Sequence, residues 1–249
     1  MKVISFSNQK GGVGKTTSSL NVAAALAKLG KRVLLVDLDP QCNLSKSYGI
    51  TSPEKNIYGA LLNEYSLGKS AFKAGKNLLL IPSTPNFSRY EKSRIGEANS
   101  QFDLKKLLKP LKEKCDYIIL DCPPALGLIT VNAYVCSDQI YVPLEAQLFS
   151  LDGLYNVENM IKEINEFLNP ELELGGVFFT RHNPRKLLNR DVQKLIKQKY
   201  NDRLMKTYIR ENISLREAPH AAKDIFEYDP ESNGAADYMG LTKEILKTV

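Results

Sequence analysis

Apolar runs of strand length recur along this chain and are separated by longer segments with a helical pattern. Six of these runs are dominated by Val, Ile, Leu or Phe, which is typical of strands buried on both faces of a sheet. The predicted strands are Val3–Phe6, Lys31–Asp39, Asn77–Pro82, Asp116–Asp121, Gln139–Leu144 and Leu174–Thr180.

Helical segments fill most of the intervals between these strands. Ser18–Leu29 is alanine-rich and stops before Gly30, a residue type that favours helix C-caps. Gln101–Lys114 and Ser150–Leu168 are amphipathic, and the leucines of the first are expected to pack in the core. This alternation predicts an α/β fold in which one doubly wound, mostly parallel sheet carries helices on both faces. Further helices are predicted at 58–65, 190–200 and 236–247.

Length and composition suit one domain spanning residues 1–249, because 43% apolar content is enough for a full core. No apolar run approaches the roughly 18 residues of a membrane span, and Met1 and Lys2 lead directly into a strand. We therefore expect neither a signal peptide nor a stable membrane anchor. The four cysteines form no CxxC pair, which indicates a cytosolic protein with reduced thiols and no zinc site.

Positive charge is concentrated late in the chain. The net charge is +6, and from Arg181 to Arg216 eleven basic residues stand against three acidic ones. In the predicted helix 190–200, which Asn189 is expected to cap, a basic face lies opposite an apolar face of Leu188, Val192 and Leu195. The basic face is either an ordinary solvated surface or a binding surface for a polyanion.

A glycine-rich loop, KGGVGKTT, joins the first strand to the alanine-rich helix. Its glycines allow backbone N–H groups to surround a phosphate chain, and the following helix presents its positive dipole end to the same anion. Lys15 is expected at the β and γ phosphates and the Thr16 hydroxyl on Mg²⁺. The predicted nucleotide-binding residues are Lys10, Gly11, Gly12, Val13, Gly14, Lys15, Thr16 and Thr17.

The loop departs from the ordinary GxxxxGK[ST] pattern, since Gln9 stands at the first glycine position and Lys10 opens the loop. This KGGxGKTT form resembles the deviant Walker A motif of the ParA/MinD ATPases, a class of P-loop NTPases. The resemblance implies that ATP is the nucleotide and that Lys10, with Lys15, is catalytic, touching the partner's nucleotide across a dimer interface. The alternative for Lys10 is a solvated loop lysine.

Aspartates end two of the predicted strands, at the sheet edge where the phosphate loop lies. Asp121 is predicted to hold Mg²⁺, as in a Walker B arrangement, and the predicted metal site comprises Thr16, Asp39 and Asp121. Asp39 is also predicted to be catalytic by orienting the attacking water, with Asp37 in support. Turn or capping roles are the alternative for Asp37 and Asp39, which precede Pro40. The DLDPQ segment resembles the DxDPQ of ParA proteins, in which the second aspartate is needed for hydrolysis. The segment from Asp121, DCPPALGLITVNA, resembles a ParA segment that senses the γ-phosphate and helps form the dimer face.

The C-terminal third also resembles ParA proteins, which bind DNA without sequence preference through arginines and lysines there. The segment YIRENISLREAP is similar to the family's IPRNxRLxEAP, which cradles the adenine, so Asn212 is expected near the base. Arg210, Glu211 and Ser214 replace proline, arginine and the usual DNA-contacting arginine of that pattern, and Arg216 is expected to compensate. The candidate DNA-binding residues are Arg185, Arg190, Lys194, Lys197 and Arg216.

The resemblance spans nearly the whole chain, from Val3 to about Leu246. It implies a cytoplasmic, nucleoid-associated ATPase that forms a homodimer with ATP, binds nonspecific double-stranded DNA, and hydrolyses ATP slowly until a ParB-like centromere-binding protein stimulates it. Hydrolysis would release the DNA and so drive chromosome or plasmid segregation. We expect no N-terminal helix-turn-helix extension, which argues only against operator-specific autorepression.

Three alternatives share parts of this pattern. A MinD-like membrane-patterning ATPase would need a C-terminal amphipathic helix with bulky apolar residues, and Leu241–Val249 is short, without Phe or Trp. A relative of the nitrogenase iron protein would need a matched cysteine pair, which Cys122 and Cys136 do not supply. A ParA relative that positions a protein cargo cannot be separated from a DNA-partitioning protein by sequence.

Overall fold

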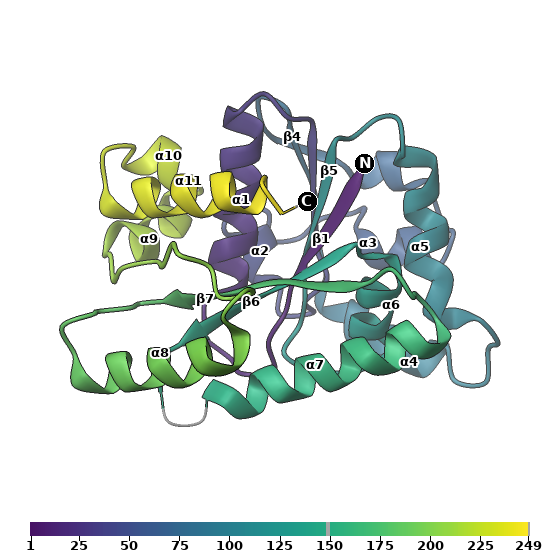
Figure 1. Ribbon diagram of the computed structural model, residues 1–249. Helices are drawn as coiled ribbons and strands as arrows, with labels where there is room; N and C mark the ends of the chain where they lie inside the picture. The colour runs from purple at the N-terminus through teal and green to yellow at the C-terminus, as the bar shows by residue number, and fades with distance from the viewer. Residues whose placement is uncertain (148–149, 249) are drawn as a thin grey trace.

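The computed structural model describes residues 1–147 and 150–248, and its described strands form one sheet in the order β3-β4-β2-β5-β1-β6-β7 (Figure 1). Neighbouring strands pair in parallel except β3, which is antiparallel to β4. The strands are β1 (Lys2–Phe6), β2 (Val33–Asp37), β3 (Phe72–Gly75), β4 (Leu78–Ile81), β5 (Tyr117–Asp121), β6 (Gln139–Glu145) and β7 (Glu173–Thr180).

All six predicted strands are present, and the doubly wound α/β prediction is confirmed. Successive residues of the central strands face opposite sides of the sheet. In β5, Ile118 and Leu120 belong to one hydrophobic core and Ile119 to the other. Because both faces are apolar, helices must cover both.

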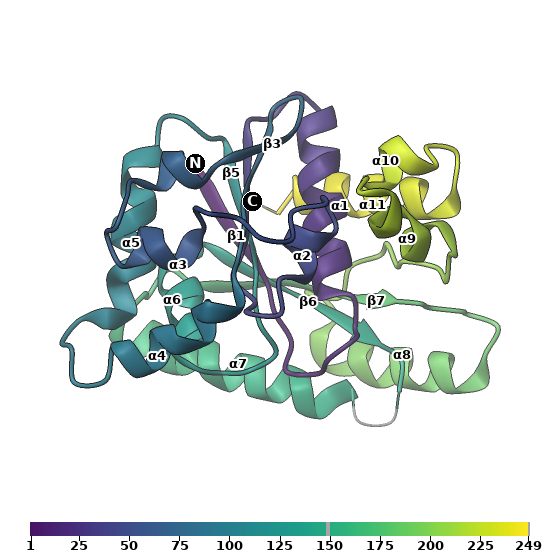
Figure 2. The ribbon, with the colours of Figure 1, turned by 180° about the vertical axis from the view of Figure 1, so that it is seen from behind.

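Two groups of helices provide this cover (Figures 1 and 2). One core receives side chains from α3, α5, α6, α7 and α8, and the other from α1, α2 and α11. The helices are α1 (Lys15–Lys28), α2 (Asn43–Lys46), α3 (Ile57–Leu61), α4 (Tyr90–Ser93), α5 (Asp103–Leu108), α6 (Leu128–Cys136), α7 (Ser150–Phe167), α8 (Leu187–Tyr200), α9 (Ser214–Glu217), α10 (Ile225–Tyr228) and α11 (Asn233–Ile245).

Several element boundaries differ from the sequence predictions. The helix predicted at Gln101–Lys114 is regular only over α5 and continues as a 3₁₀ turn at Lys109–Leu111, since Pro110 lacks the N–H that an α-helix needs. Its leucines nevertheless pack into the core as predicted. Gly30 follows α1 with φ +84°, the left-handed geometry expected of a residue that ends a helix. Helix α6 and strand β3 were not predicted, and β3 is a short, half-exposed edge strand without an apolar run.

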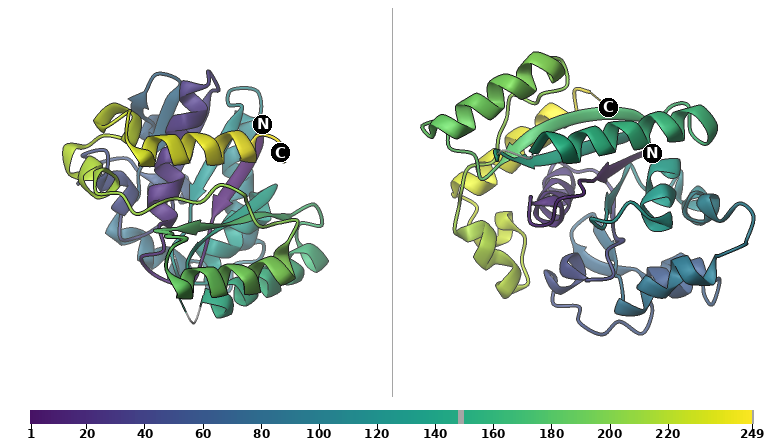
Figure 3. Two further views of the ribbon diagram at one scale, coloured as in Figure 1. Left: turned by 60° about the vertical axis from the view of Figure 1, so that its left-hand side comes forward. Right: turned by 90° about the horizontal axis from the view of Figure 1, so that it is seen from below.

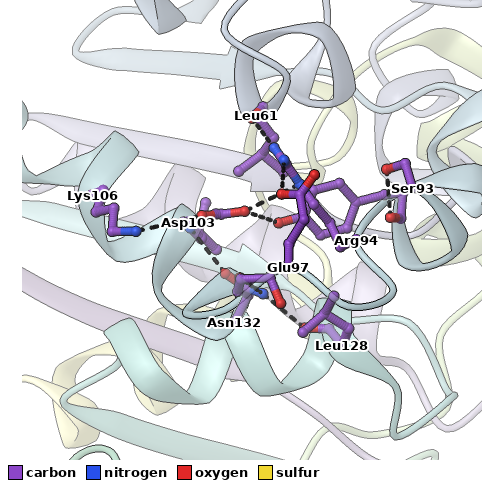
Figure 4. A network of polar contacts seen from close by, with 11 residues as sticks. Leu61, Ser93, Arg94, Glu97, Asp103, Lys106, Leu128 and Asn132 are labelled. Carbon is purple, nitrogen blue, oxygen red and sulfur yellow. Dashed lines mark hydrogen bonds and ion pairs between the residues drawn. The ribbon is translucent and has the colours of Figure 1, made fainter.

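A polar network fastens α4, α5 and α6 together on one face of the sheet (Figure 4). Asp103 accepts a hydrogen bond from the Tyr90 hydroxyl at 2.9 Å and pairs with Arg94 at 3.3 Å. Asn132 of α6 accepts from the Leu104 backbone N–H at 3.0 Å. These contacts hold the helices that cover this face of the sheet in place.

No helix in residues 1–147 and 150–248 is long and apolar enough to cross a membrane.

Candidate functional site

The carboxyl ends of β1, β2 and β5 meet at one edge of the sheet, where the phosphate loop leaves β1. Strand β5 lies between the other two, and its last residue, Asp121, is in register with Asp37 on one side and Phe6 on the other. Parallel strands that end together bring their terminal residues into one small volume. The predicted grouping of loop and carboxylates therefore follows from the strand register.

The phosphate loop is held open by glycine geometry and by a distant threonine. Gly12 and Gly14 have φ values of +77° and +90°, which L side chains rarely adopt. A Cβ on Gly14 would also lie 3.4 Å from the Thr180 methyl group. Thr180, at the end of β7, donates its hydroxyl to the Val13 carbonyl at 2.8 Å. The loop is thus braced from the opposite half of the sheet.

Lys15 is the buried cation of this site, with only 7% of its surface exposed. Its Nζ donates to the Lys10 carbonyl at 3.1 Å, so the ammonium lies inside the loop. Burial lowers the pKa of Lys15, while the nearby carboxylates of Asp121 and Asp39 act in the opposite direction. A poorly hydrated ammonium inside a glycine loop suits a phosphate chain.

Asp121 is completely buried at the end of β5. Its Oδ1 accepts a hydrogen bond from the Ser19 hydroxyl at 3.0 Å, but its buried Oδ2 has no well-formed partner among the described residues. Burial, with the nearby charge of Asp37, raises the pKa of Asp121 to about 8, and the hydroxyls of Thr16 and Ser19 oppose that rise. A buried, unsatisfied carboxylate oxygen is costly unless a cation or proton is supplied.

These groups fit Mg²⁺ bound together with a phosphate. The described residues contain no group of three or more His, Cys, Asp or Glu side chains that could hold a metal alone. Mg²⁺ commonly uses one or two carboxylates and completes its shell with water and substrate phosphates. The Asp121 carboxylate and the Thr16 hydroxyl, which faces it, supply oxygen donors of that kind.

Asp37 and Asp39 occupy different environments although they are two residues apart. Asp37 is fully buried and accepts hydrogen bonds from the Ser45 hydroxyl at 2.6 Å and the Ser45 N–H at 2.8 Å. Burial raises the pKa of Asp37 to about 6. Among the bonds within the described chain, the Asp39 carboxylate accepts only from the Gln41 N–H, at 2.9 Å through Oδ1. Asp37 therefore stabilises the end of the strand, whereas the Asp39 carboxylate can still accept further hydrogen bonds beside the loop.

Lys10 is half-buried at the mouth of the loop. Its backbone N–H donates to Asn8 Oδ1 at 3.0 Å, and its Nζ contacts the Gln147 side chain of the same chain. The same Asn8 amide donates to the Pro143 carbonyl at 2.9 Å, so Asn8 links the loop to β6. A Lys10 side chain that reached a second subunit would first have to leave Gln147.

A small cavity adjoins the phosphate loop on the side of α11, and Asn212 lines it together with Gly14 and Thr17. Asn212 also accepts from the Leu215 N–H at 3.3 Å, which bends the chain around the cavity. Arg216 lines the same cavity and pairs with Glu211 at 3.1 Å. The structure thus groups Arg216 with Asn212, beside the predicted nucleotide.

The basic face of α8 is exposed. Arg185, Arg190, Lys194 and Lys197 all lie at the surface, and Arg190 donates to the Pro184 carbonyl at 2.6 Å. Within the described chain neither Lys194 nor Lys197 takes part in an ion pair. Four positive side chains therefore follow one short stretch of exposed surface. Helix α8 itself lies at the edge of the molecule (Figure 3).

Two predictions about α8 are wrong. Asn189 does not cap the helix, which begins two residues earlier at Leu187 with Lys186 at the N-cap position. The buried face comprises Asn189, Val192, Ile196 and Tyr200. The predicted face fails at both ends, because Leu188 is 46% and Leu195 is 52% exposed. Packing into the core selects this neighbouring face of the helix and not the one that periodicity indicated.

Comparisons with known proteins agree with this geometry. A family model described as an AAA domain matches residues 1–174. The chain is 40% identical over 248 residues to the sporulation initiation inhibitor protein Soj of Bacillus subtilis, covering 98% of each chain. It is 34% identical to the chromosome partitioning protein ParA of Caulobacter vibrioides, covering 99% of this chain and 94% of that protein. The chain belongs to the ParA family.

Solved structures support the same assignment. Cobyrinic acid a,c-diamide synthase from Mycobacterium smegmatis, solved with an ATP analogue and magnesium, has a TM-score of 0.88 and 28% identity, covering 99% of this chain and 95% of that one. A plasmid partition protein from Borrelia burgdorferi has a TM-score of 0.82 and 26% identity, covering 100% and 99%. This ParA-family chain therefore shares a complete fold with proteins of more than one named activity.

Sequence reasoning missed three residues that support the ParA-type loop. Asn8, Ser19 and Thr180 hold the loop backbone or the Asp121 carboxylate, and all three are buried. Ser19 lies four residues after Lys15, a helical spacing that places both on one side of α1. That spacing was a usable signal, whereas nothing local marks Thr180, which approaches the loop only through the sheet.

Proposed function

We propose that this chain is a single-domain partitioning ATPase of the ParA type, acting on ATP with Mg²⁺. The observation that carries the proposal is the placement of buried Lys15 inside a glycine loop beside the unsatisfied Asp121 carboxylate. Relatives named for chromosome and plasmid partitioning, and a structural relative with an ATP analogue and magnesium, support the function and the nucleotide.

Each residue has a distinct task in this proposal. Thr16 and Asp121 would hold Mg²⁺, with Asp39 near it, and the ion would neutralise charge on the phosphates. The loop N–H groups and Lys15 bind and orient the phosphate chain. Asp39, with an acceptor oxygen beside the loop, holds the attacking water and accepts its proton. Asp37 and Ser45 keep Asp39 at the strand end, since the Asp39 N–H donates to Asp37 Oδ1 at 3.1 Å.

The functional unit in this proposal is an ATP-bound homodimer. Lys10 leaves Gln147 and contacts the nucleotide of the second subunit, so ATP binding and dimer formation are coupled. Two copies of the exposed surface of Arg185, Arg190, Lys194 and Lys197 then contact the phosphates of double-stranded DNA. Contacts of this type are independent of sequence and weaken steeply with salt.

Release follows hydrolysis, because loss of the γ-phosphate removes the contact that joins the subunits. Hydrolysis stays slow until a ParB-like centromere-binding protein stimulates it, and the protein works in the cytoplasm in association with the nucleoid. Repeated binding and release along DNA would then segregate a chromosome or plasmid.

The test is a DNA gel shift with the full chain at about 50 and 200 mM salt, with and without ATP. We expect retention of nonspecific duplex DNA only with ATP, and much weaker retention at the higher salt. Lys10→Ala should bind ATP normally but lose both the dimer, measured by light scattering, and DNA retention. Lys2→Ala, an exposed lysine at the opposite sheet edge, is the control. Absence of retention with ATP at low salt, or an ATP-dependent dimer of Lys10→Ala, would contradict the proposal.

A further inference from the structure

Arg210 stands where the similar ParA segment, IPRNxRLxEAP, has proline. Its side chain binds Asp237 of α11, a contact that we call the clasp. The guanidinium approaches both oxygens of the Asp237 carboxylate, with Nη2 at 2.6 Å from Oδ1 and Nε at 3.0 Å from Oδ2. The Arg210 backbone N–H also donates to Asp237 Oδ2 at 2.9 Å. Asp237 is 8% exposed, so one residue supplies the hydrogen bonds of a nearly buried carboxylate.

This clasp lies at the wall of the cavity beside the phosphate loop. Arg210 lines that cavity with Asn212, and so does Tyr238, the residue after Asp237. The Tyr238 hydroxyl is 3.1 Å from the Ser18 hydroxyl of α1, the helix that begins at the phosphate loop. Helix α11 crosses α1 in two views (Figures 1 and 3). The clasp therefore ties the cavity wall to the helix that carries the phosphate site.

Proline and arginine can fix this wall by different physical means. Proline restricts its own φ and removes an N–H, which stiffens a loop without any partner. Arginine has neither property, but its planar fork can lock bidentately onto a carboxylate. The N–H bond from residue 210 to Asp237 is available only because proline is absent.

We propose that Arg210 is a positioning residue for the nucleotide base: clasped to Asp237, it fixes the loop from Ile209 to Asn212 against α11 and so sets the wall of the base pocket. The inference rests on the proposed ATPase function. The clasp takes over the rigidity that proline provides in the resembling pattern, and Arg210 acts through the loop it orders. The base meets a preformed wall, which strengthens binding because less ordering remains for the nucleotide to drive.

A second contact on α11 serves as a control that distinguishes a role in base binding from a role in stability alone. Glu244 accepts from the Lys206 and Thr207 backbone N–H groups at 2.7 and 2.9 Å. It therefore ties the same helix to the same stretch of chain through one carboxylate. The described lining of the cavity includes neither Glu244 nor these two partners. Loss of this tie should cost stability without changing the base pocket.

The experiment compares Arg210→Ala, Asp237→Asn, their double variant and Glu244→Gln, each as the full chain, well below its melting temperature. We expect Arg210→Ala to raise the Kd for ATP about tenfold. This is less than the loss expected for a fully buried ion pair, because the arginine side chain is 42% exposed. Its preference for ATP over GTP should fall, and the ATP turnover rate at saturation should stay within about twofold. Asp237→Asn should match it, and the double variant should be no worse than either single one.

Glu244→Gln should lower the melting temperature and leave both nucleotide affinities unchanged. The inference is overturned if Arg210→Ala binds ATP like the wild type, or if Glu244→Gln weakens ATP binding to the same extent. It is equally overturned if the two clasp substitutions add fully in the double variant. Failure of the wild-type chain to bind ATP would instead contradict the proposed function, so the two failures are distinguishable.

Discussion

The phosphate loop and the surface of α8 both use lysines, but they place them in opposite environments. Lys15 is buried, and its Nζ is held by the Lys10 carbonyl close to Asp121. Lys194 and Lys197 are exposed on α8 and have no ion-pair partner within the described chain. A buried lysine is held in one position, so its removal is expected to abolish the contact that it makes there. Exposed lysines act together through their summed field, so each contributes a small and salt-dependent share.

The largest effect is expected for Lys15→Ala. Loss of the buried ammonium leaves the phosphate chain without its nearest cation, so ATP affinity should fall at least about a hundredfold. Calorimetric titration with ATP and Mg²⁺ measures it. Lys28→Ala, in the last turn of the same helix, should bind ATP like the wild type. Equal affinity in Lys15→Ala and Lys28→Ala would erase the distinction between a buried and an exposed lysine.

The next largest effect is expected for Asp39→Ala, which keeps the loop and removes the proposed water-holding group. ATP turnover should fall about a hundredfold or more, while ATP binding and the dimer persist. Phosphate release and light scattering with ATP report the two properties. Asp202→Ala, an exposed aspartate after α8, is the matched control. Unchanged turnover in Asp39→Ala would mean that the water is held elsewhere.

Local and long-range contacts differ in how well they could be predicted from the sequence. The loop, the strand ends and their grouping were predictable, because each lies within a short segment and parallel strands align their carboxyl ends. The bracing by Thr180 depends on contact between the loop and β7, 167 positions along the chain, and no local pattern encodes it. At α8, periodicity alone chose Leu188 and Leu195, but packing against the sheet buries Ile196 instead. A half-buried helix offers several apolar stripes, and the tertiary fold selects among them.

A smaller effect is expected for the pH dependence of stability, through the buried His182. His182 is 2% exposed and lies between the rings of Phe179 and Tyr208, at centroid distances of 5.0 and 4.8 Å. Burial lowers the pKa of His182 below 6.5. The folded state then binds fewer protons than the unfolded state, so this contribution to stability is present above pH 6.5 and is lost as pH falls through the folded pKa.

We therefore expect the His182 contribution to lower the melting temperature by a few degrees, about 2–4 °C per kcal/mol lost, as pH decreases from 7 to 5. Asp37 acts in the opposite direction, because its raised folded-state pKa favours the folded state as pH falls. His182→Phe, which keeps a ring between the two aromatic neighbours, should weaken this dependence. His220→Gln removes the other histidine of the chain and should leave the dependence unchanged. An identical pH profile for the wild type and His182→Phe would show that groups other than His182 set the acid sensitivity.

The smallest effect is expected for a single lysine of α8. Lys194→Ala removes one proposed phosphate contact, so DNA affinity with ATP should fall only a few-fold at low salt, and the slope of log affinity against log salt should decrease by about one per subunit. Lys109→Ala removes an exposed lysine from the segment after α5 and is the control for net charge. ATP turnover without DNA should be unchanged in both. If the two variants lose DNA affinity equally, the net positive charge of the whole molecule attracts DNA, and the basic face of α8 is not a specific DNA-binding surface.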